Sequence, residues 1–190
     1  MQLTDIQLRE KLKEGISVVG NATSLLSTEY GSLIDSRPTI RFNWSTIINT
    51  TAQGNRWDFI ATGHRYMRTC NKHLDKYKKF QFHTLLYNTK GVLDNLDGKC
   101  KYSNLFDWHT LDIDSRSKLH QQTLPHKPSS GLHILNLLDY FEIKNVHIFG
   151  FDAMKTKSFY TDEPSHAHDF EKEHKIIHGL IQKNQWKQYT

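Results

Sequence analysis

The 190-residue sequence predicts an α/β protein, with a mostly parallel central sheet flanked by helices in a Rossmann-like arrangement. Short β-branched or aromatic runs alternate along the chain with segments whose apolar residues recur at helical spacing, as in proteins built on parallel sheets. There is no internal repeat or low-complexity linker, and prolines number only four. We therefore expect one domain over residues 1–190, a length that can bury a sizeable core.

The first element expected is a helix over residues 4–14. Thr4 or Asp5 can cap its N-terminus, three apolar residues line one side, and Gly15 ends it. Residues 16–20 form a β-branched run that closes on a glycine, which predicts a buried strand. Three more strands are expected over residues 38–43, 57–62 and 80–87, which contain β-branched and aromatic residues.

The second half of the chain is expected to hold two amphipathic helices with a strand between them. Residues 88–124 are polar and rich in turn formers, so they predict only mixed short elements. Residues 130–142 and 169–183 carry apolar residues at helical spacing. Residues 145–151 read as a buried strand that ends at Asp152.

Composition limits the compartment and the partners. The net charge of +5 comes from scattered lysines and arginines, which allows an anionic ligand and argues against a dedicated nucleic-acid binder. Two cysteines, Cys70 and Cys100, exclude a disulfide framework and a four-cysteine zinc site, so a reducing cytoplasm is the compartment expected. No apolar run reaches the length of a transmembrane helix, and residues 1–15 lack the pattern of a signal peptide. The oligomeric state cannot be read from the sequence.

Two turns combine small polar residues with a strand end or a helix start. In the segment Val18-Val-Gly-Asn-Ala-Thr-Ser24, the glycine lets a ligand approach the backbone, and Asn21 can bind a phosphate oxygen or a ribose hydroxyl. In Pro128-Ser-Ser-Gly131, two hydroxyls and the free N–H groups of a helix start can cradle an anion or a nucleobase. Each segment taken alone is more typical of an ordinary turn or a helix cap than of a ligand site.

A third segment, residues 165–174, places a histidine at the start of the last expected helix. A neutral imidazole at His168 can act as a general base, and Glu173 lies where it can orient the local structure. The alternative is a capped surface helix with an exposed histidine.

Together these segments resemble the sialyl motifs of the eukaryotic-type sialyltransferases, glycosyltransferase family 29. Residues 18–43 resemble the large motif and residues 128–152 the small motif, while His168 and Glu173 match the very small motif, His-x₄-Glu. The three occur in the family's order and cover about a third of the chain, mainly its two ends.

The resemblance implies a Rossmann-like variant of the GT-A fold that transfers sialic acid from CMP-sialic acid to a glycan hydroxyl, with inversion and without a metal. The partners would be the CMP-sugar donor, as co-substrate, and a glycan acceptor, with no cofactor. His168 would be the catalytic base, supported by Glu173. By match to the motifs, the residues that would bind the nucleotide and the rest of the donor are Asn21, Ala22, Asn43, Ser129, Ser130, Gly131 and Tyr160.

Departures from the family pattern point to a short bacterial or viral member. Ile16 and Ile143 stand where vertebrate members have the two cysteines of a disulfide, and these apolar side chains could pack together instead. The third motif is represented only by residues 159–162, where Phe159 replaces the histidine that assists the leaving phosphate. Tyr160 or His166 could substitute for it. Because the chain is shorter than typical catalytic domains of the family, acceptor specificity does not carry over.

Three other interpretations stay open. A CMP-sugar-binding protein without real turnover would keep the donor pocket and lose the reaction. A transferase using CMP-Kdo would act on a donor with the same carboxylated 2-keto acid core. A metal-dependent hydrolase would use the C-terminal histidines, which are His166, His168, His174 and His178.

Overall fold

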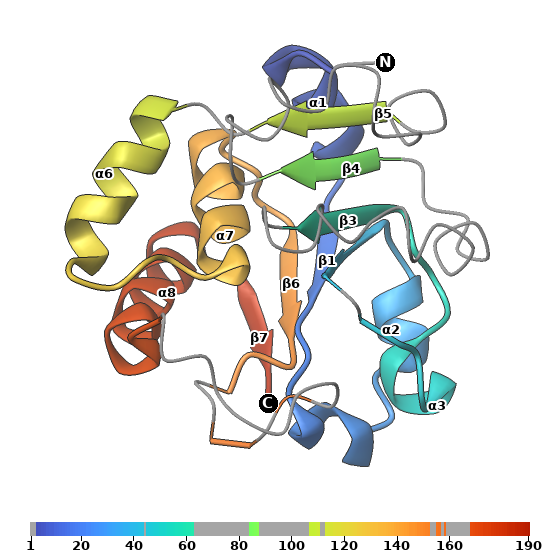
Figure 1. The fold of residues 1–190 in the computed structure, drawn as a ribbon. Helices are drawn as coiled ribbons and strands as arrows, with labels where there is room; N and C mark the ends of the chain where they lie inside the picture. Colours follow the sequence, from blue (N-terminus) through green and yellow to red (C-terminus); the bar gives the residue numbers. More distant parts are fainter. Residues whose placement is uncertain are drawn as a thin grey trace, which may run out of the picture.

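The computed structural model describes residues 3–43, 45–62, 84–87, 107–110, 113–152, 155–156, 158 and 168–190. In these residues the chain forms a parallel sheet with helices on both faces (Figure 1), which confirms the predicted α/β class. The strands are β1 (Ile16–Val19), β2 (Thr39–Phe42), β3 (Phe59–Thr62), β4 (Thr84–Tyr87), β5 (Asp107–Thr110), β6 (Val146–Phe149) and β7 (Lys187–Tyr189). The helices are α1 (Asp5–Leu12), η1 (Thr23–Ser27), α2 (Gly31–Asp35), α3 (Thr50–Gln53), α6 (Ile113–Thr123), α7 (Ser130–Tyr140) and α8 (Phe170–Asn184).

The strand order creates a switch point in the middle of the sheet. The order is β5-β4-β3-β2-β1-β6-β7, and every pair of neighbours is parallel. The chain therefore moves outward from β1 to β5 and then returns to lay β6 on the other side of β1. Ligands of open parallel sheets bind outside the carboxyl ends of the strands at such a point. Here the ends are Val19 and Phe149, which pair in register.

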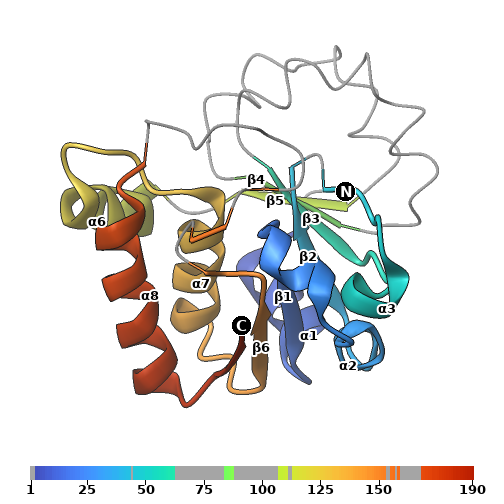
Figure 2. The same ribbon diagram turned by 90° about the horizontal axis from the view of Figure 1, so that it is seen from below.

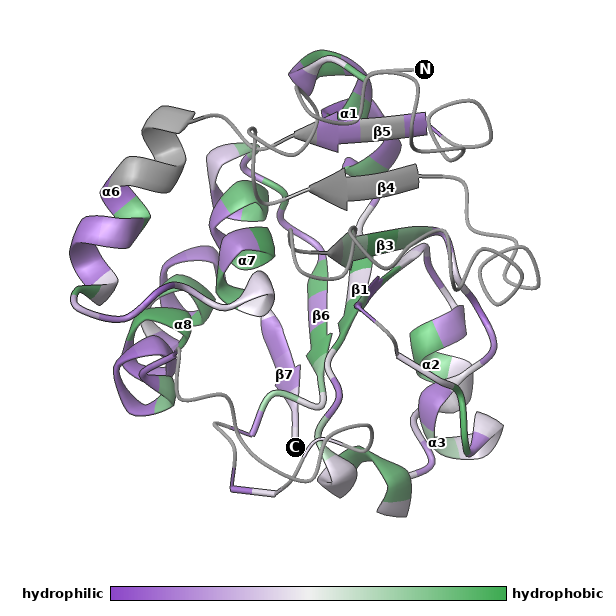
Figure 3. Cartoon of the chain, viewed as in Figure 1, coloured by the Kyte–Doolittle hydropathy of each residue, from purple (hydrophilic) through white to green (hydrophobic). Residues whose placement is uncertain are grey.

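The hydrophobic core lies between the sheet and the helices on one of its faces. The core contains α1 and α7 side chains packed on alternate residues of β1, β2, β3 and β6, with α8 completing the layer. Figure 2 shows α7 and α8 on one side of the sheet and α2 and α3 on the other, and Figure 3 shows the hydrophobic residues gathered in β1, β6 and α7. Ile16 and Ile143 are both buried in this core, as expected from their apolar character.

Several elements differ from the sequence prediction for identifiable reasons. Strand β7 was not predicted, because its three residues are polar or half-buried and it pairs only at the edge, with β6. The helices η1, α2 and α3 are four or five residues long, too short to show helical periodicity. Within residues 88–124, predicted as mixed short elements, the structure describes β5 and the eleven-residue helix α6. Residues 80–83 of the predicted fourth strand lie outside the described part.

No helix in the described ranges is long and apolar enough to cross a membrane.

A buried histidine on β6 gives the fold a pH dependence. His147 is 5% exposed; it accepts a hydrogen bond at Nδ1 from the Tyr189 hydroxyl (3.0 Å) and donates from Nε2 to the Asn145 amide oxygen (3.1 Å). Burial lowers the pKa of His147 to about 4, and the nearby charges of Arg37 and Lys187 add to this effect. Between pH 4 and 6.5 the unfolded chain therefore binds a proton at this residue that the folded chain does not.

We predict that the free energy of unfolding falls as the pH drops from about 6.5 toward 4, with about 3 kcal/mol contributed by His147. Urea unfolding at a series of pH values measures this. The control is His147→Phe, which keeps an aromatic ring to stack on Tyr189 and cannot titrate. The difference between wild type and variant should change below pH 6.5, and parallel profiles would contradict the prediction.

Candidate active site

Two glycines, Gly20 after β1 and Gly150 after β6, let the backbones of the two turns lie in close contact at the switch point. The Gly20 N–H donates to the Phe149 carbonyl oxygen at 2.7 Å, and Gly150 has a positive φ of 65°. A Cβ atom on Gly20 would lie 2.3 Å from the Gly150 carbonyl oxygen. From the sequence, Gly20 was expected to let a ligand approach the backbone. In the structure, the space beside Gly20 is filled by Gly150 and Phe151 of the neighbouring turn.

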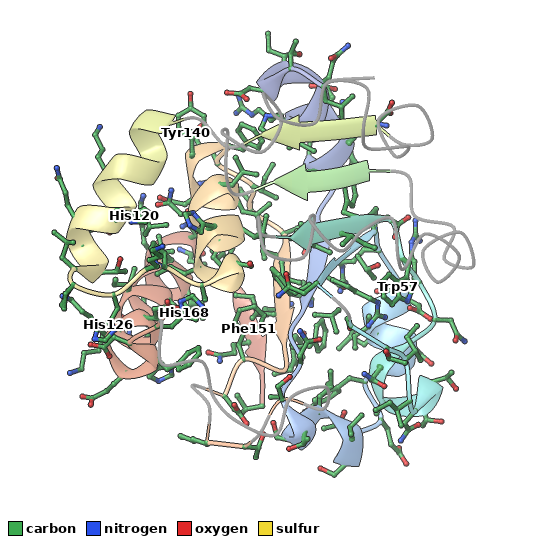
Figure 4. The ribbon with its side chains drawn as sticks, viewed as in Figure 1. Trp57, His120, His126, Tyr140, Phe151 and His168 are labelled. Atoms are coloured by element: carbon green, nitrogen blue, oxygen red, sulfur yellow. The ribbon has the colours of Figure 1, made fainter. Side chains whose placement is uncertain are left out.

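Phe151 connects three segments that are far apart in sequence. Its ring packs edge-on against Phe42 at the end of β2, with centroids 5.8 Å apart. A Cβ atom on Gly131 would lie 2.7 Å from Phe151 Cε1, so the start of α7 is in close contact with this ring. Gln188 of β7 fixes the Phe151 backbone by donating to its carbonyl oxygen at 2.7 Å. Figure 4 shows Phe151 beside the carboxyl end of β6.

The two predicted nucleotide-binding asparagines lie at neighbouring strand ends. Val19 pairs with Arg41, so Asn21 and Asn43 follow β1 and β2 at matching positions of adjacent parallel strands. Asn43 has a φ of 50°, a left-handed conformation that asparagine tolerates, and its N–H donates to the Ala61 carbonyl oxygen at 2.9 Å. The Asn21 Oδ1 atom is buried and accepts no hydrogen bond from the described residues.

A buried arginine, Arg41, fixes the end of β2 just before Asn43. The Arg41 side chain is fully buried; Nη2 donates to the Gln53 carbonyl oxygen (2.6 Å) and Nε to that of Arg56 (2.9 Å). Its guanidinium also lies 5.5 Å from the centre of the Trp57 ring. Burial lowers the pKa of Arg41 to about 10, so the group stays charged at neutral pH. The end of β2 is therefore anchored to the loop before β3.

The predicted Pro-Ser-Ser-Gly cradle is tied to α8 by one buried carboxylate. Ser129 caps α7, and its Oγ accepts from the Leu132 N–H at 3.2 Å. The Ser129 N–H and hydroxyl both donate to Glu173, at 2.7 and 2.5 Å. Burial raises the pKa of Glu173, and the two hydrogen bonds from Ser129 act in the opposite direction. Ser129 thus has a structural partner, while the predicted donor contacts of Ser129, Ser130 and Gly131 stay predictions.

His168 lies beside this junction, immediately before α8, with its side chain 24% exposed. Its Nδ1 atom is 2.6 Å from the Lys127 carbonyl oxygen and 3.9 Å from Glu173 Oε1. A carbonyl oxygen can only accept, so Nδ1 carries the proton and Nε2 of the neutral ring keeps a lone pair. Figure 4 shows the side chain next to the start of α8. The arrangement can accept a proton from a bound hydroxyl at Nε2.

The structure thus brings the three motif segments together at one edge of the sheet, and adds residues that the sequence did not assign. Phe151 and Asp152 were placed at a strand end within the small motif and were given no individual role. The Lys127 carbonyl oxygen had no signal in the sequence because a backbone group makes the contact. Tyr160 and His166, with Phe159, lie outside the described residues. Among the residues described, no three histidine, cysteine or acidic side chains form a group that could hold a metal.

The solved structures compared below share this fold and are sialyltransferases. A mammalian sialyltransferase superposes with a TM-score of 0.63 at 16% identity, covering 92% of this chain and 68% of the other. CstII from Campylobacter jejuni in complex with the substrate analogue CMP-3FNeuAc gives 0.62 at 15% identity, covering 92% and 80%. The same enzyme in complex with a trisaccharide acceptor and CMP gives 0.61 at 16%, covering 92% and 79%. No protein-family model matches the chain, and no curated protein matches it significantly. The fold is therefore that of sialyltransferases.

Proposed function

We propose that this protein is a metal-independent, inverting glycosyltransferase that moves sialic acid, or a related 2-keto sugar acid, from a CMP-sugar to a glycan hydroxyl. The observation that carries the proposal is a cluster in a chain with the fold of sialyltransferases: Glu173 accepts two hydrogen bonds from Ser129 and lies 3.9 Å from His168, a potential base. The low cysteine content supports action in a reducing cytoplasm.

In the proposed reaction the acceptor oxygen attacks the anomeric carbon of the donor while His168 Nε2 takes the hydroxyl proton. The bond from that carbon to the phosphate oxygen breaks, CMP leaves with the electron pair, and one displacement gives inversion. A positioned base contributes about 10²–10⁴ in rate. Alignment of the two substrates and stabilisation of the departing phosphate supply the rest.

Neutral groups at the strand ends are suited to hold the donor. The buried Asn21 Oδ1 atom is an acceptor that a ribose hydroxyl would satisfy, and Asn43 and Ala22 lie around the same edge. Ser130 and Gly131 open α7, whose N-terminal dipole favours an anionic group. Tyr160 and His166 are the candidates to assist the leaving phosphate.

Release of CMP from CMP-sialic acid and from CMP-Kdo, assayed with EDTA and a mixed glycan acceptor library, tests this proposal. We expect transfer from one of the two donors, and EDTA should leave the rate unchanged. Binding of CMP with only slow hydrolysis would instead favour a CMP-sugar-binding protein. Activity that is lost in EDTA and restored by zinc would favour the metal-dependent alternative.

A further inference from the structure

One carboxylate oxygen after β6 joins two segments of the proposed donor site. Asp152 Oδ2 accepts from the Ser24 hydroxyl at 2.9 Å, from the Thr156 N–H at 3.1 Å and from the Thr156 hydroxyl at 2.5 Å. The Ser24 N–H in turn donates to Thr156 Oγ1 at 3.1 Å. Ser24 belongs to η1, directly after the turn that carries Asn21, so the contacts span more than 120 residues of sequence.

A backbone contact extends the same connection. Ala22 and Ser158 form an isolated antiparallel bridge, two residues on from Thr156 and two before Ser24. Side-chain and backbone contacts therefore hold the residues after β6 against the turn after β1. We refer to Asp152, Ser24 and Thr156 as the Asp152 lock.

The chemistry of the lock assigns Asp152 a positioning role and makes direct contact with the donor unfavourable. A CMP-sugar acid carries a phosphate and a carboxylate, and an uncompensated aspartate beside it would repel both. Three donors converge on Asp152 Oδ2, which directs its charge toward the protein and leaves that oxygen no capacity to act as a base.

We propose that Asp152 is a positioning residue that holds the Asn21–Ser24 turn together with Thr156 and Ser158 as one unit, preformed for the nucleotide part of the donor. This inference rests on the proposed function. His168 is held separately, by Lys127 and Glu173, so losing the lock should weaken nucleotide binding far more than it slows the chemical step.

The test compares Asp152→Ala and Asp152→Asn with Asp139→Ala as control. Asp139 also accepts three hydrogen bonds, from Lys183 and Asn184, but on the α7–α8 side. In Asp152→Ala we expect the amides of Ser24 and Thr156 to lose hydrogen-exchange protection together without ligand. We also expect CMP affinity and donor KM to worsen about tenfold with kcat within about threefold, Asp152→Asn being intermediate because its amide oxygen still accepts. Asp139→Ala should change neither protection nor affinity.

Two results would overturn the inference. Retained exchange protection at either segment would show that Asp152 does not join them. Equal CMP affinity of wild type and Asp152→Ala would show that the junction is only structural. If wild type binds no cytidine nucleotide, the proposed function fails and the donor-positioning role fails with it, while the exchange data still decide whether the lock exists.

Discussion

Replacing His168 with alanine is expected to lower the transfer rate by about 10²–10⁴-fold while CMP affinity stays within about twofold of wild type. The loss follows because Nε2 is the proposed acceptor of the hydroxyl proton, and no step of CMP binding depends on that atom. The measurement is kcat from CMP release, together with calorimetric titration of CMP into both proteins.

His174→Ala is the matched control, because His174 lies in α8, the helix that follows His168, and its ring neighbours that of His178, with centroids 6.4 Å apart. Its kcat should equal that of wild type. Near-normal transfer by the His168 variant would show that His168 is not the base. Loss of CMP binding in that variant would instead indicate that His168 contributes to the donor site.

Replacing Glu173 with glutamine is expected to lower the free energy of unfolding by about 2–3 kcal/mol and to impair transfer. Both carboxylate oxygens of the 3%-exposed Glu173 accept from Ser129, and glutamine would turn an N–H₂ group toward one of those donors. The start of α7, capped by Ser129, would lose part of its connection to α8, which carries residue 173. Chemical denaturation at pH 7 and kcat of the variant measure the two effects.

Glu171→Gln serves as the control. Within the part of the chain that the structure describes, the exposed Glu171 side chain pairs with the exposed Lys175, whose Nζ lies 2.9 Å from Glu171 Oε1. This substitution should change the stability by less than about 0.5 kcal/mol. An equally small change in Glu173→Gln would mean that the buried junction does not hold the two helices together.

The sequence predicted the helices and strands whose apolar residues follow a regular pattern. Strands β1, β3 and β6 are mainly apolar, β2 alternates polar with apolar residues, and α7 and α8 have regular apolar faces, so each was found within a few residues of its ends. The edge strand β7 and the short helices α2 and α3 were missed because tertiary contacts, and not local pattern, define them.

The sequence predicted the motifs of the site one by one, but it did not predict the contacts that connect them. Spacing around His168 and Glu173 gave a base with a supporting acid, but only the fold shows that Glu173 bonds to Ser129, 44 residues away. The Asp152 lock depends on Thr156, which no motif marks. The contacts of the Asp152 lock depend on the parallel pairing of β1 with β6, which brings the segments after the two strands together and is a property of the topology.

The central claim is that the carboxyl edge at β1 and β6 binds a cytidine nucleotide, and a thermal-shift comparison of CMP with UMP, GDP and AMP tests it most directly. At a concentration about 100 times its dissociation constant, CMP should stabilise the fold by about 2.7 kcal/mol, which raises Tm by about 5–10 °C for a chain of this size. The other nucleotides should raise Tm far less. Equal shifts with all four nucleotides, or no shift with CMP, would contradict the account.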